Sequence, residues 1–255
     1  MRRREKFVLA AVFLSFCLLV VQYMSLDWRY IALAGFAVLT YFITALVLYE
    51  DLQKHEWLTI VPGPSLYALS VGLFYFLLPG NLVTRILILV FFGIGMYALF
   101  LTTNIYAVAK GRTIQLLHAA HAVELLFTLI TSLLFTNTIF SLRLPFYFTS
   151  GLIGLVHLPI IFMSLWAIRL EKQISKEVWA FSICLALLVA EFAMVLSFMP
   201  FAIWYYALFI MSFLYIGLSV LRSHLMGRLF SRAITEYLLV SVFVAVLFFG
   251  LLPWK

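Results

Sequence analysis

Long apolar segments alternate with short polar ones along almost all of this 255-residue chain. None of them shows the strict alternation of a half-buried strand, and most approach the roughly 20 residues that a helix needs to cross a bilayer. Because only helices and closed barrels satisfy their backbone hydrogen bonds in lipid, we expect an all-α, polytopic integral membrane helical bundle of about nine transmembrane helices. The nine segments are residues 7–24, 30–49, 58–78, 86–108, 114–135, 145–168, 178–198, 201–221 and 237–252.

Two of these segments are weaker candidates for a span. In the third, Pro62, Gly63 and Pro64 interrupt the pattern near its start and leave about 14 clean residues. A discontinuous helix and the ordinary start of a helix explain this interruption equally well. The ninth segment is only 16 residues long. Eight spans is therefore the alternative, and it would move the C-terminus to the other side of the membrane.

The charges of the loops predict how the chain is threaded. With the N-terminus in the cytoplasm, 13 of the 17 Lys and Arg residues fall in inside segments and four fall in outside segments. By the positive-inside rule this bias predicts a cytoplasmic N-terminus and an outside C-terminus. All six tryptophans lie at, or within about one turn of, a predicted span end, as residues of an interfacial aromatic belt do.

Composition supports one membrane domain over residues 1–255, with the lipid bilayer as its main partner. Hydrophobic residues make up 66% of the chain and charged residues 11%, and the mean hydropathy is +1.15, beyond the range of water-soluble domains. The net charge of +7 is spread over short loops, which argues against nucleic-acid binding. The two cysteines, Cys17 and Cys184, lie in separate apolar segments and form neither a disulfide framework nor a CxxC motif.

The fifth apolar segment is unusual because it carries three ionisable side chains, His118, His121 and Glu124. Their three-residue spacing places them within an arc of about 120° on one helix face. At a rise of 1.5 Å per residue they would lie about 8, 12 and 16 Å from the cytoplasmic end. Glu124 would then be near the middle of a hydrocarbon core of about 30 Å.

The next two segments add one ionisable residue each. His157 would lie about 16 Å from the cytoplasmic side, at the depth of Glu124, and Glu191 about 20 Å from it. Short loops join these segments, so the helices can be neighbours. We therefore expect His121, Glu124, His157 and Glu191 to cluster near the middle of the bilayer.

Small and polar residues accompany His157. Ser150, Gly154 and His157 share one narrow face of the sixth segment. We expect the glycine to leave room beside the imidazole, since small residues let neighbouring groups approach closely in membranes.

Ionisable groups inside a membrane are costly and usually serve a function. A carboxylate there takes up a proton unless an imidazolium or a metal ion restores its charge. We therefore predict a transporter in which His118, His121, Glu124, His157 and Glu191 bind or relay a proton or another cation.

Two alternatives stay open, and the sequence identifies no substrate for any of them. In the first, His121, Glu124, His157 and Glu191 bind a divalent metal such as Zn, Mn or Fe in an intramembrane hydrolase, although no HExxH motif is present. In the second, the polar groups only lock the helices of a structural subunit, which contacts other membrane proteins or further copies of itself.

Overall fold

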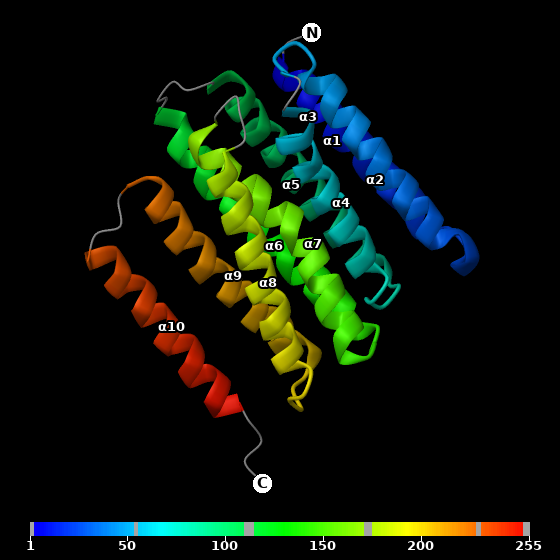
Figure 1. The fold of residues 1–255 in the computed structure, drawn as a ribbon. Coiled ribbons are helices and arrows are strands. Elements are labelled where there is room, and N and C mark those ends of the chain that lie inside the picture. The colour runs from blue at the N-terminus through cyan, green and yellow to red at the C-terminus, as the bar shows by residue number, and fades with distance from the viewer. Residues whose placement is uncertain (1–2, 54–55, 110–114, 171–174, 228–230, 252–255) are drawn as a thin grey trace. The chain divides into compact units, whose positions relative to one another are not determined.

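Figure 1 shows the computed structural model of the protein, which describes residues 3–53, 56–109, 115–170, 175–227 and 231–251. Within these residues every regular element is a helix. The helices are α1 (Arg3–Gln22), α2 (Leu26–Leu48), α3 (Glu56–Thr59), α4 (Pro62–Tyr75), α5 (Leu82–Ala109), α6 (Gln115–Ser141), α7 (Phe146–Arg169), α8 (Lys176–Leu196), α9 (Ile203–Leu225) and α10 (Ser231–Leu251).

Eight helical stretches of the described chain are long and apolar enough to cross a membrane, with α3 and α4 counted together as Glu56–Tyr75. They confirm the predicted all-α, polytopic membrane bundle. The apolar part of α10, Tyr237–Gly250, is shorter, and it corresponds to the segment that the sequence already marks as weak. The sides of the membrane on which the two ends lie stay a prediction.

The interruption in the third segment separates the single turn α3 from α4. Ile60 and Val61 lie between the two helices, and Pro62 is the first residue of α4. Proline suits this position because the first backbone N–H groups of a helix have no partner within it. The structure therefore has features of both explanations. A short helical turn precedes the break, and the main helix begins at the proline.

The described residues group into two compact units, Met1–Phe127 and Thr128–Lys255, and the boundary falls within α6. A single domain over the whole chain stays a prediction. In the first unit α1 packs against α2 and α5, and α4 packs against α2 and α5. Aromatic rings fill this interior, where Tyr67 stacks on Phe92 at a centroid distance of 5.8 Å.

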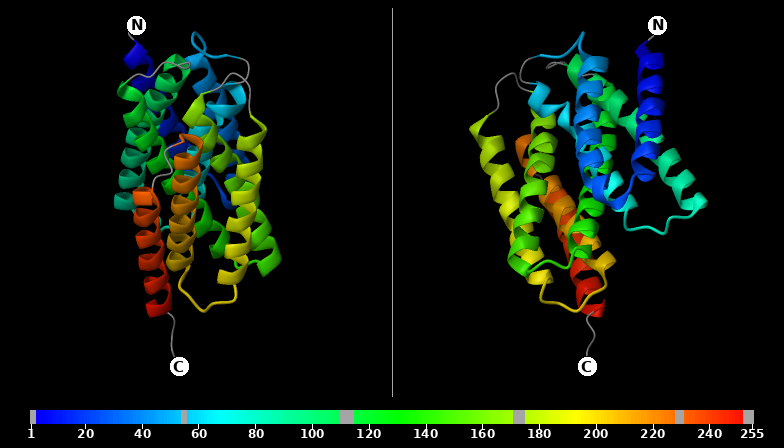
Figure 2. Two further views of the ribbon diagram at one scale, coloured as in Figure 1. Left: turned by 60° about the vertical axis from the view of Figure 1, so that its left-hand side comes forward. Right: turned by 90° about the vertical axis from the view of Figure 1, so that its right-hand side faces the viewer.

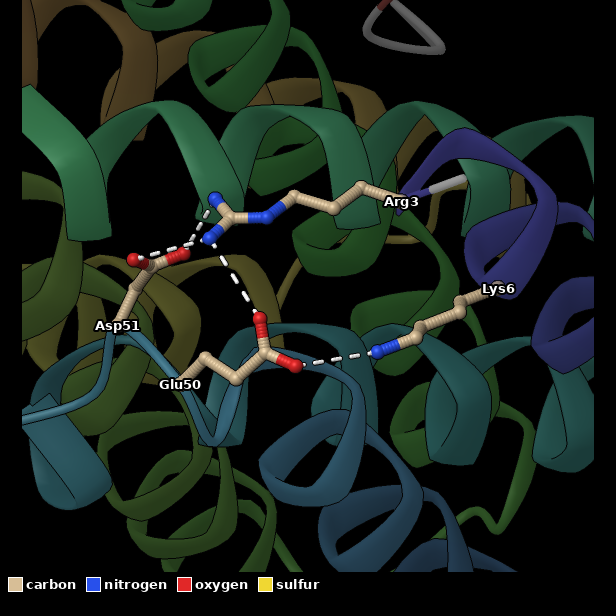
Figure 3. Close-up of polar contacts among 4 residues, drawn as sticks. All are labelled: Arg3, Lys6, Glu50 and Asp51. Atoms are coloured by element: carbon tan, nitrogen blue, oxygen red, sulfur yellow. Dashed lines mark hydrogen bonds and ion pairs between the residues drawn. The ribbon is translucent and has the colours of Figure 1, made fainter. Parts of the chain in front are cut away.

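Ion pairs join the start of α1 to the segment after α2 (Figure 3). The Arg3 guanidinium donates to the Asp51 carboxylate at 2.7 Å, and the Lys6 ammonium donates to the Glu50 carboxylate at 3.2 Å. The Lys6 hydrogen bond, together with the charges of Lys6 and Arg3, lowers the pKa of Glu50 below its ordinary value. Because Arg3, Lys6 and Glu50 are exposed and Asp51 is partly exposed, the pairs orient the helix ends more than they stabilise the fold.

In the second unit α7 packs against α8 and α9, and α10 packs along α9 (Figures 1 and 2). Local signals set the helix ends. The Ser175 hydroxyl accepts a hydrogen bond from the backbone N–H of Val178 at the start of α8. Just after α9, Gly227 adopts a φ of +64°, a conformation that glycine tolerates without strain. The hydroxyls of Ser223 and Tyr237 meet at 2.9 Å and join α9 to α10.

Small residues let α7 and α8 approach closely. Ser150 and Gly154 of α7 face Ala186 and Ala190 of α8, a small-xxx-small pattern on both helices. A Cβ atom added to Gly154 would lie 3.0 Å from Ala190 Cβ and 3.7 Å from the carbonyl oxygen of Ala186. The space beside Gly154 is thus taken by α8, and not by the His157 ring as expected from the sequence.

This packing predicts different responses at two glycines of α7. Leucine in place of Gly154 must push α8 away, and we expect Gly154→Leu to lower the free energy of unfolding in detergent by about 1–3 kcal/mol. Gly151 is exposed and has no atom within 4 Å of its added Cβ, so Gly151→Leu is the matched control and should change stability little. Equal losses for the two variants would contradict the close α7 and α8 contact.

The ion pairs of α1 predict a shifted titration. An NMR titration of Glu50 should give a pKa below the ordinary glutamate value in the native protein and a higher pKa in Lys6→Gln. The stabilisation from this contact is present above the ordinary pKa and is lost as the pH falls through the lowered one. Arg4→Gln removes a charge from the same turn of α1 and is the control, and a comparable rise there would argue against the specific Lys6 contact.

Candidate functional site

The structure places His118, His121 and Glu124 on the first half of α6, in the unit Met1–Phe127. His118 is exposed, whereas His121 and Glu124 are half-buried. The His121 ring lies 5.6 Å from the Tyr106 ring of α5, measured between centroids. These three ionisable residues therefore form the accessible first part of a polar helix face.

The second half of α6 carries buried hydroxyl groups that continue this face. Taken together, the seven residues cover an arc of about 140°, at 100° per residue, and about 27 Å along the helix axis. That length approaches the thickness of the hydrocarbon core. We call this set the α6 polar face: His118, His121, Glu124, Thr128, Thr131, Ser132 and Thr136.

The four hydroxyl residues of the α6 polar face were not among the predicted site residues. The prediction rested on ionisable side chains, and the predicted fifth span ends at residue 135, six residues before the end of α6. The available signal was the continuation of the three- and four-residue spacing from Glu124 through Thr128 and Thr131.

His157 of α7 is fully buried and bonded through both ring nitrogens. Its Nδ1 lies 2.8 Å from the carbonyl oxygen of Ile153, and its Nε2 lies 2.7 Å from the Ser132 hydroxyl. Because a carbonyl oxygen can only accept, Nδ1 carries the hydrogen, and in the neutral ring Nε2 accepts from Ser132. His157 thus joins α7 to the α6 polar face within the second unit.

His157 is the middle member of a row of three buried polar residues spaced seven apart on α7. Ser150 donates to the carbonyl oxygen of Ala190 on α8 at 2.7 Å, and Ser164 accepts from the Arg222 guanidinium on α9. The row spans about 21 Å at 1.5 Å per residue. At three depths, α7 is therefore hydrogen-bonded to three different helices.

Charged groups join the same helices at the end of α7. The Arg169 guanidinium donates to the carbonyl oxygen of Leu225 on α9 at 3.2 and 3.3 Å, and to the Glu177 carboxylate on α8 at 3.1 Å. His224 Nε2 lies 3.9 Å from the other Glu177 oxygen. These contacts hold this end of the second unit together, whereas the sequence indicated its basic residues only as loop charges that orient the chain.

Glu191 lies on α8 in the second unit, and its side chain is exposed. Among the residues that the structure describes, no hydrogen bond or ion pair connects it to His157 or to any other side chain. The convergence of His121 and Glu124 with His157 and Glu191 joins residues of different units, and it stays a prediction.

A metal centre has no geometric support in the described residues, where no three His, Cys, Asp or Glu side chains are placed to hold a metal ion. That alternative rests on the sequence alone.

Comparison of the chain with protein-family models, curated proteins and solved structures finds no match. By helix length and hydropathy the chain is a multi-pass integral membrane protein.

The bond between Ser132 and His157 predicts a stability loss. In Ser132→Ala a buried ring nitrogen loses its partner, and we expect the free energy of unfolding in detergent to fall by about 1–2 kcal/mol. Ser182 is equally buried, but its hydroxyl donates to Val178 of its own helix, so Ser182→Ala is the matched control and should be nearly neutral. A loss no larger than that of the control would show that the bond contributes little.

Proposed function

We propose that the protein translocates protons or another small cation along the α6 polar face, with its N-terminus in the cytoplasm. The observation that carries the proposal is the length of this face, because polar side chains follow one another over about 27 Å along one side of α6. An ion crossing hydrocarbon needs such a series of partners, and ionisable residues in membrane spans commonly mark ion and proton routes.

Each part of the α6 polar face has a distinct role in this proposal. His118 is exposed and exchanges the ion with water at the end of α6 that the loop charges place in the cytoplasm. Glu124 binds the ion, since a carboxyl group exchanges a proton or balances a cation's charge. The buried hydroxyls of Thr128, Thr131 and Ser132 continue the route towards His157, whose ring accepts a hydrogen bond from Ser132.

Glu191 lies on α8 and does not belong to the α6 polar face, so it supplies a matched control. In liposomes carrying the purified protein, a pH-sensitive dye reports proton flux after a membrane potential is imposed. We expect Glu124→Gln, which keeps the shape of the side chain but cannot exchange a proton, to lower the flux at least tenfold. We expect Glu191→Gln to retain it. A proton flux in Glu124→Gln equal to that of the native protein would contradict the proposed route.

A structural role is the second candidate, favoured by the occupied nitrogens of His157 and by the three bonds of α7 to its neighbours. In that case the polar groups hold the helices together and move no ion. Wild-type liposomes would then show no more flux of protons, Na⁺ or K⁺ than protein-free liposomes, and Ser132→Ala would change stability alone.

A further inference from the structure

One face of α8 combines exposure, regular spacing and an unpartnered carboxyl group. Cys184, Leu188, Glu191 and Val195 are all exposed and follow one another at steps of four, three and four residues. We call these four residues the α8 outer stripe. Steps of this kind form the seam along which two helices pack at a small left-handed crossing angle.

Glu191 is the residue of the α8 outer stripe that requires a hydrogen-bonding partner. It lies about 22 Å from the start of α8 and about 8 Å from its end, at 1.5 Å per residue, and therefore within the hydrocarbon. Lipid tails offer no hydrogen-bonding group, and a carboxyl group left unpaired there is costly. Among the described residues of the chain, none bonds to the Glu191 side chain.

A second copy of this chain meets the requirement without any further component. A two-fold axis along the membrane normal places the Glu191 side chains of both copies at the same depth, facing each other. A protonated carboxyl group has one donor and one acceptor, so two of them, or one with one carboxylate, bond to each other. The apolar neighbours Leu188 and Val195 would pack on either side of this pair.

We propose that the α8 outer stripe is the interface of a homodimer in the membrane, with the two Glu191 side chains hydrogen-bonded across the two-fold axis.

Cys184 lies one heptad before Glu191 on the same stripe and makes the interface directly testable. The chain has two cysteines, so Cys17→Ala leaves Cys184 as the sole thiol. Liposomes with a low protein-to-lipid ratio are treated with a short bismaleimide and analysed on a denaturing gel. We expect a covalent dimer at twice the 29.3 kDa mass of the chain.

The matched control moves the thiol to another exposed face at a similar distance from a helix end. Val12 of α1 is 62% exposed and lies nine residues from the start of its helix, as Cys184 lies eight from the start of α8. Val12→Cys in a protein lacking both native cysteines should give no dimer above the level of random collision.

Variants of Glu191 test the hydrogen bond itself. Glu191→Leu removes it and should lower the dimer association constant about tenfold, as measured by cross-linking across a series of protein-to-lipid ratios. Glu191→Gln keeps one donor and one acceptor at the same place and should cross-link like the native side chain.

Cross-linking of Cys184 no stronger than that of Val12→Cys would overturn the dimer, and full cross-linking of Glu191→Leu would overturn the role of Glu191. Cross-linking of Cys184 only to a different protein, in native membranes, would also overturn the homodimer.

Discussion

A polar side chain inside hydrocarbon finds no water, so it must find a partner in the protein or leave the membrane interior. Helix α7 shows the consequence most clearly. Ser150, His157 and Ser164 each bond to a different neighbouring helix, and together they connect α7 to α8, α6 and α9. Hydrophobic burial cannot hold membrane helices together, because lipid tails are as apolar as leucine. Specific bonds and close packing of small residues therefore decide how the second unit is built.

Under the proposed function, the same constraint gives the α6 polar face two compatible uses. Its buried half is bonded to α7 through His157, and this contact positions the helix. Its ionisable half, with His121 and Glu124, is half-buried and accessible for exchange. A helix held firmly at one half can present ionisable groups at defined depths on the other, and a translocation route needs defined depths.

The outer surface of α8 poses the opposite problem, because Glu191 faces away from the interior of its unit. Apolar residues on such a surface are satisfied by lipid, but a carboxyl group is not. The unsatisfied group turns an ordinary lipid-facing surface into a self-complementary one. The proposed homodimer thus applies at the surface the same rule that governs the interior.

Much of the fold could be predicted from the sequence because hydrocarbon thickness and the α-helical rise are fixed quantities. Run length therefore predicted the spans, and it also marked residues 237–252 as a weak segment. Pro62 indicated either a helix start or a break within a helix. The placement of His118, His121 and Glu124 on one helix face also follows from the sequence alone, because it depends only on their spacing along α6.

The partner of each side chain required the tertiary structure. Periodicity says which residues share a face, but not which helix that face meets. The structure alone placed Ser132 against His157 and Ala190 against Gly154, and it alone placed Glu191 on an exposed surface of α8. The physical reason is that most spans here are apolar on nearly all sides, so hydropathy does not distinguish a helix face that packs on protein from one that faces lipid.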